Sequence, residues 1–135
     1  MTVLVVYGDP QGPARGPALR LTRSLRRLGI PARARAAGRV ARLERAAALV
    51  VALDRAGAGE IAELLESFGL PAAGLPVFAL RVDDVPLPGG ARALPGTRDG
   101  GMLPRDPGAV LRSASGLAVE VRRAAPPART VRTLP

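Results

Sequence analysis

Two short runs made only of apolar residues constrain the fold of this chain more than any other feature. They are VLVV at 3–6 and AAALVVAL at 46–53. A strand with one solvated face alternates apolar and polar residues, whereas a strand of a parallel sheet is covered on both faces and is apolar throughout. The two runs therefore predict neighbouring, buried strands of a parallel sheet. The length of 135 residues suits one domain, which we expect to span residues 1–124.

Between these runs and after them, apolar residues recur with helical spacing. Leu21, Leu25 and Leu28 lie at i, i+4 and i+7. Pro17 suits the first position of a helix and Gly29 the position after its end, so we expect a helix over about 17–28. The second helical repeat consists of Ile61, Leu64, Leu65 and Phe68, and Gly69 is expected to end it.

Three further segments have the patterns of regular structure. PARARAA at 31–37 alternates alanine and arginine, which is typical of a strand at a sheet edge. PVFALRV at 76–82 predicts another buried strand. Segment 106–124 has helical spacing throughout and strand-like alternation in its second half. We favour the helix, because Asp106 can cap it and Pro107 can begin it.

The stretch from 83 to 105 is dense in proline and glycine, and we expect it to be irregular. Only GML at 101–103 is a candidate for a fifth strand, and the tail at 125–135 is expected to be disordered. The alternation of strands and helices predicts a doubly wound α/β domain. Ligands of such sheets bind beyond the carboxyl ends of the strands, so the loop Gly8 to Gly16 is the candidate site.

Composition excludes several kinds of chemistry. The chain has no cysteine and no histidine, which removes disulfides, thiolate nucleophiles, the usual zinc ligands and the commonest general base. No apolar run is long enough for a membrane span and the amino terminus lacks a signal-peptide pattern, so we expect a cytoplasmic protein. Three glutamates, Glu60, Glu63 and Glu66, have the spacing of a solvated helix face, and we expect no metal site.

The net charge is +9, and every basic residue is arginine. A GC-rich genome produces such a composition without selection for binding, so the charge alone does not show a function. The best candidate for an interaction surface of the chain consists of Arg20, Arg23 and Arg27, with Arg33 and Arg35 next to it. The positive charge of this surface suggests an acidic protein as the partner. A solvated helix face is the alternative. Nucleic acid is not expected, because three aromatic residues offer little surface for base stacking.

Four segments carry a family resemblance by their order and spacing. They are VLVVYG with the glycine-rich loop after it, AAGRVARLERAAALVVAL, LPVFAL and GLAVEVRRAAP. Over most of its length the chain resembles the flavodoxin-domain family. The resemblance implies a five-stranded parallel sheet with strand order 2-1-3-4-5, and FMN as the usual ligand.

In that family, a loop rich in serine and threonine after the first strand holds the FMN phosphate with hydroxyl and backbone N–H groups. If this chain binds FMN, the resemblance assigns that role to Gly8, Asp9, Gln11, Gly12 and Arg15. The loop has no hydroxyl, Pro10 and Pro13 lack an N–H, and Asp9 would bring a carboxylate close to the phosphate. We therefore expect a degenerate site with weakened or lost FMN binding, in a non-catalytic binding or accessory module.

Two other functions remain open. An FMN-dependent oxidoreductase or electron-transfer flavoprotein would hold the phosphate with Arg15 and the N–H groups of Gln11 and Gly12. The stretch TVLVVYGDP is also similar to response-regulator receiver domains, and that likeness would make Asp54 a phosphate acceptor. Gly8 replaces half of the acidic pair that a receiver needs for Mg²⁺.

The likeness to a receiver departs at two more positions. Arg81 stands near the expected threonine or serine, and Arg105 near the expected lysine. We therefore expect Asp54 to be a residue at a strand end that pairs with Arg55 or caps a turn.

Overall fold

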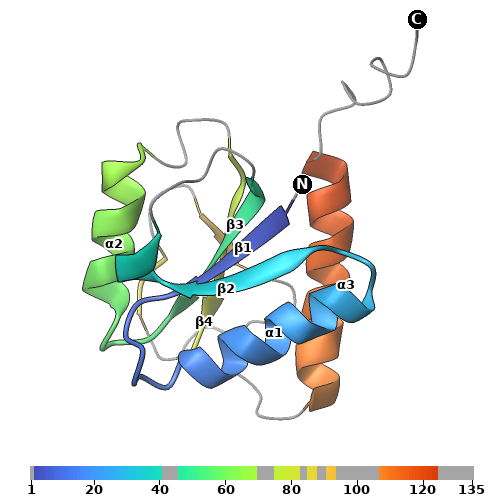
Figure 1. Cartoon of the computed structure of the whole chain (residues 1–135), viewed down its shortest axis with the longest axis horizontal. Helices are drawn as coiled ribbons and strands as arrows, with labels where there is room; N and C mark the ends of the chain where they lie inside the picture. Colours follow the sequence, from blue (N-terminus) through green and yellow to red (C-terminus); the bar gives the residue numbers. More distant parts are fainter. Residues whose placement is uncertain are drawn as a thin grey trace, which may run out of the picture.

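A five-stranded parallel sheet with helices on both faces forms the core of the protein (Figure 1). The structure is a computed structural model and describes residues 2–40, 46–69, 75–82, 85–87, 91–93 and 107–124. The strands are β1 (Thr2–Tyr7), β2 (Ala32–Ala36), β3 (Ala46–Leu53), β4 (Val77–Arg81) and β5 (Arg92–Ala93). The helices are α1 (Arg15–Arg27), α2 (Ala58–Ser67) and α3 (Pro107–Ala124), with a 3-10 turn, η1, at Ala37–Arg39. The strand order β2-β1-β3-β4-β5 confirms the doubly wound α/β prediction.

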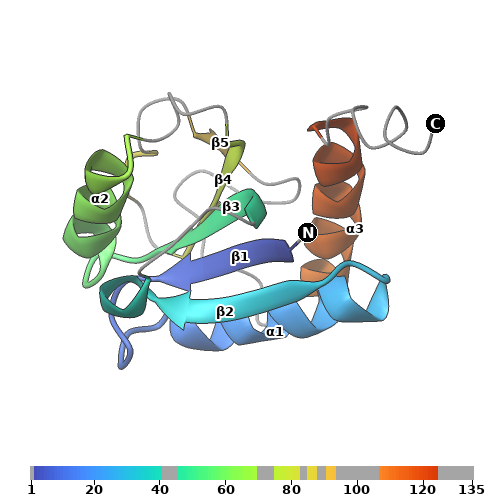
Figure 2. The ribbon, with the colours of Figure 1, turned by 45° about the horizontal axis from the view of Figure 1, so that its top comes forward.

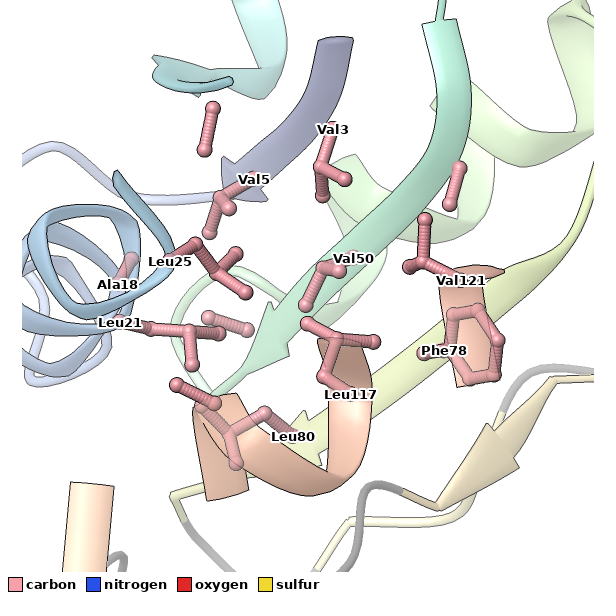
Figure 3. Packing of buried hydrophobic residues seen from close by; sticks show 14 of the residues in the cluster. Val3, Val5, Ala18, Leu21, Leu25, Val50, Phe78, Leu80, Leu117 and Val121 are labelled. Carbon is pink, nitrogen blue, oxygen red and sulfur yellow. The ribbon is translucent and has the colours of Figure 1, made fainter. Parts of the chain in front are cut away.

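The central strand β3 explains the longest apolar run, because its side chains alternate between two cores. Val50 packs with Leu21 and Leu117 in the core beneath α1 and α3, part of which is drawn in Figure 3. Val51 packs with Ile61 in the core beneath α2. Both faces of the strand are therefore covered, which is the condition that favours apolar residues at every position.

The first helix begins two residues earlier than its sequence predicts. It starts at Arg15, so Pro17 is its third residue and not its first. A proline fits there because the first turn of a helix makes no internal hydrogen bond through its N–H groups. The end of the helix is as predicted, since Gly29 has the positive φ of 82° that favours glycine.

The fifth strand corrects the prediction for the proline- and glycine-rich region. It is formed by Arg92–Ala93, which pair with Phe78 and Ala79 of β4, within a stretch expected to be irregular. A strand of two residues is too short to produce a periodic signal. The candidate at 101–103 lies outside the described residues.

The last helix has the type that its sequence favours. Pro107 is the first residue of α3. The expected cap, Asp106, and the tail at 125–135 lie outside the described residues. In the part of the chain that the structure describes, no helix combines the length and the apolar character that a membrane crossing requires.

The edge strand β2 has the predicted alternation. Ala32 and Ala36 are buried, and Arg33 and Arg35 are exposed. The register with β1 decides the side of the sheet on which these arginines stand: Arg33 lies opposite Leu4, and Leu4 packs in the core beneath α2. The two arginines of β2 therefore stand on the side of α2, and α1 lies on the other side (Figure 2).

Candidate functional site

Two loops meet at the carboxyl ends of β1 and β3, which are neighbours in the sheet. Asp54 is the first residue after β3 and its exposed fraction is 0%. Its Oδ2 accepts the backbone N–H of Ala14, in the loop after β1, at 3.0 Å. Its Oδ1 accepts the N–H of Gly57 at 2.6 Å. One buried carboxylate thus joins the loop before α1 to the turn before α2.

Glycine permits the two loops to approach this closely. A Cβ atom at Gly12 would lie 2.5 Å from Asp54 Oδ2. A Cβ atom at Gly57 would lie 2.7 Å from Gly8 Cα and from the Asp9 nitrogen, and one at Gly8 would overlap the Gly57 backbone. Real Cβ contacts are essentially never shorter than 3.0 Å. The contact between the two backbones therefore requires glycine at positions 8 and 57, and a side chain at position 12 would displace the Asp54 carboxylate.

Asp9 binds two further N–H groups of the loop after β1. Its Oδ1 accepts the N–H of Gln11 at 2.9 Å. Its carbonyl oxygen accepts the N–H of Gly12 at 3.0 Å. These are the two N–H groups that an FMN phosphate would need in the oxidoreductase hypothesis.

Residues 10–15 of the loop leave no backbone donor for an anion. Pro10 and Pro13 have no N–H, Ala14 donates to Asp54, and Arg15 donates to the carbonyl of Gly12 at 3.4 Å. Between residues 10 and 15, all of which the structure describes, every backbone N–H is either missing or donated within the protein. A helix N-terminus that binds phosphate needs these groups to point outward.

The residues assigned to the cofactor by resemblance lie in one turn and at the start of a helix. Gly8 is buried, Asp9 is half-buried, and Gln11 is exposed. Gly12 lies close to the Asp54 carboxylate, and Arg15 is the exposed first residue of α1. The loop lies where the sequence predicts it, and the N–H groups of Gln11, Gly12 and Ala14 donate to acceptors within the protein.

Sequence reasoning missed the acceptor that organises this site. Asp54 was expected to pair with Arg55 or to cap a turn, and its bond to Gly57 confirms the capping role. Its bond to Ala14, 40 residues away in sequence, was not expected. An available signal was an acid directly after an apolar strand, with glycine three residues later. The engaged, buried carboxylate is also unlike an accessible phosphate acceptor, which argues against the receiver hypothesis.

Among the residues that the structure describes, neither an aromatic platform nor a cluster of metal ligands accompanies the loop. Tyr7 packs against the core beneath α1 and α3, Phe68 packs against the core beneath α2, and Phe78 is 2% exposed. The turn at 54–57 has no aromatic residue. Within the described ranges, no three acidic side chains gather as a metal ion would require.

Comparison with solved structures identifies the fold. An archaeal flavodoxin matches with a TM-score of 0.65 and 14% identity, over 90% of this chain and 99% of that one. Diflavin flavoprotein A3 from Nostoc sp. matches with a TM-score of 0.59 and 15% identity, over 92% of this chain and 95% of that one. The chain has the flavodoxin fold. A short-chain flavodoxin associated with a bacterial microcompartment also matches this flavodoxin-like domain, with a TM-score of 0.59 and 16% identity. The match covers 90% of this chain and 99% of that one.

No protein-family model matches the chain, and no curated protein matches its sequence. At these identities the likeness concerns the fold, and the function of this flavodoxin-like domain has to be argued from its own residues.

Proposed function

We propose that this flavodoxin-like domain is a non-catalytic binding or accessory module, in which FMN binding is weakened or lost. The hydrogen bond between the Ala14 N–H and the buried Asp54 carboxylate is the observation that carries the proposal. The carboxylate is a built-in anion, and it takes the donor at the start of α1 that a phosphate would otherwise use.

Binding a phosphate at this loop would carry three costs. The Ala14 N–H would have to leave Asp54, and a buried carboxylate would lose one of its two hydrogen bonds. The phosphate dianion would then lie beside that carboxylate in a partly desolvated place, where like charges repel strongly. Gln11 would also have to leave Asp9. Arg15 is exposed, so its attraction for phosphate is weakened by water and salt.

Titration with FMN tests the proposal. The purified protein is expected to be colourless, and calorimetry is expected to find no saturable binding with a Kd below about 100 µM. Yellow protein with a Kd of about 1 µM or less, lost in Arg15→Ala, would contradict the proposal and support the FMN-dependent oxidoreductase or electron-transfer flavoprotein.

Removal of the internal anion provides a second measurement. Asp54→Ser frees the Ala14 N–H and is expected to strengthen binding of inorganic phosphate or FMN by about tenfold or more. Glu60→Ser is the matched control, because it removes the same charge from an exposed position in α2 and is expected to change binding little. Should Asp54→Ser fail to fold, Asp9→Ser provides the same measurement by freeing Gln11.

A further inference from the structure

The outer face of α1 carries a line of arginines. Ala18, Leu21 and Leu25 bury the inner face of the helix against the sheet. Arg20, Arg23 and Arg27 occupy positions i, i+3 and i+7 on the opposite face, and all three are exposed. We call these three residues the arginine stripe. It spans about 10 Å along the helix.

The charges of the arginine stripe are not compensated within the described chain. The sequence has no acidic residue from 10 to 40. None of the three arginines pairs with an acidic side chain that the structure describes, whereas Arg123 pairs with Glu120 at 3.7 Å. Like charges this close repel one another, and an acidic surface placed over them would relieve the repulsion.

The position of the arginine stripe differs from the joint patch that the sequence suggested. Arg33 and Arg35 lie opposite Leu4 and Val6 of β1, whose side chains pack in the core beneath α2. They therefore stand on the other side of the sheet from α1. Helix α2 covers that side of the sheet (Figure 1), and its glutamates are exposed.

We propose that the arginine stripe docks an acidic helix of a partner protein. Carboxylates at i, i+4 and i+7 of an antiparallel helix match the spacing of the three guanidinium groups, each of which can bind a carboxylate with two hydrogen bonds. A protein fits better than a nucleic acid, because all three aromatic side chains pack in or against the two cores. The proposal goes beyond the loss of FMN and names the partner that a binding module requires.

The test measures binding of a fluorescein-labelled helical peptide with glutamate at i, i+4 and i+7 to the full chain, by fluorescence anisotropy. Wild type is expected to bind the peptide saturably and more weakly as NaCl is raised. The triple variant Arg20→Glu, Arg23→Glu and Arg27→Glu is expected to lose at least about tenfold in affinity.

A matched variant separates the site from the overall charge. Arg33→Glu, Arg35→Glu and Arg39→Glu reverse three exposed arginines outside α1, with the same change in net charge. This control is expected to change the affinity by less than about threefold. Far-ultraviolet circular dichroism checks that both variants are folded. Equal weakening in the two variants would overturn the proposal, because it would show a general charge effect.

Two more results would overturn it. One is equally tight binding of single-stranded DNA, lost in the same α1 variant. The other is self-association of the wild type at low salt, lost in that variant, which would make a second copy the occupant. All these substitutions leave the loop at 8–14 unchanged, so the peptide measurement and the FMN titration fail independently.

Discussion

At the scale of single residues, the Asp54 carboxylate is an internal acceptor for the N–H groups of two loops. It is buried, and its two oxygens accept N–H groups from two loops. A buried charge is tolerated when hydrogen-bonded donors surround it, and bonds to a charged acceptor are the stronger ones. The same bonds that stabilise the two loops therefore occupy the donor that a phosphate would use.

The substitution Asp54→Asn tests this role. The amide keeps the shape of the side chain and one acceptor oxygen, but it turns an NH₂ group toward one of the two backbone donors. The free energy of unfolding is expected to fall by about 1–3 kcal/mol. Urea denaturation measures it, with Asp9→Asn, at a half-buried position, expected to cost less than about 1 kcal/mol. Equal stabilities for wild type and Asp54→Asn would show that the carboxylate does not hold the loops.

Part of this site could be predicted from the sequence. The position of the loop, its missing hydroxyls and the two prolines could all be read directly. The contact between Asp54 and Ala14 could not, because it depends on how closely the ends of β1 and β3 approach in the folded sheet. A pattern along one segment carries no information about such a distance.

At the scale of elements, the loop after β1 and the turn before α2 form one packed unit. The backbone atoms of Gly8 and Gly57 are in direct contact, with no space between them for a side chain. Neither residue has a positive φ, so space, and not backbone conformation, is what requires glycine here.

A pair of glycine substitutions two residues apart tests the contact. Gly57→Ala places a Cβ 2.7 Å from Gly8 Cα and is expected to cost about 1–3 kcal/mol. Gly59→Ala, in α2, meets no atom within 4 Å. It is expected to stabilise the protein by about 0.5–1 kcal/mol, because alanine is the better helix former. Thermal and urea unfolding measure both changes; a neutral Gly57→Ala would mean that the loops are further apart.

Prediction of the elements succeeded where a pattern covered several residues. The run at 46–53 coincides with β3, and the helical repeat around Ile61 lies in α2. It failed at β5, where Arg92 and Ala93 alone form the strand. The start of α1 was also misplaced. A proline is tolerated at any position of the first turn, so Pro17 does not determine at which residue the helix begins.

At the scale of the whole molecule, the described residues form a flavodoxin-like sheet, and the N–H groups of Gln11, Gly12 and Ala14 in the loop after β1 are engaged within the protein. The sheet order and the two cores are those of a flavodoxin fold. Apolar runs and helical repeats predicted a doubly wound α/β domain with buried parallel strands, and the family resemblance supplied the strand order. The distribution of charge was harder to predict, because one residue of register decides which face Arg33 occupies. A flavodoxin-like sheet in which these N–H groups are already engaged is what the proposed binding module requires.

The most direct test follows the backbone amides of Gln11, Gly12 and Ala14 in ¹H–¹⁵N spectra while FMN is added up to about 1 mM. Because these N–H groups already donate to Asp9 and Asp54, their resonances are expected to keep their positions. Saturable shifts of all three amide resonances, with a Kd of about 10 µM or less, would show that these N–H groups bind a phosphate. That result would contradict the proposal that FMN binding is weakened or lost.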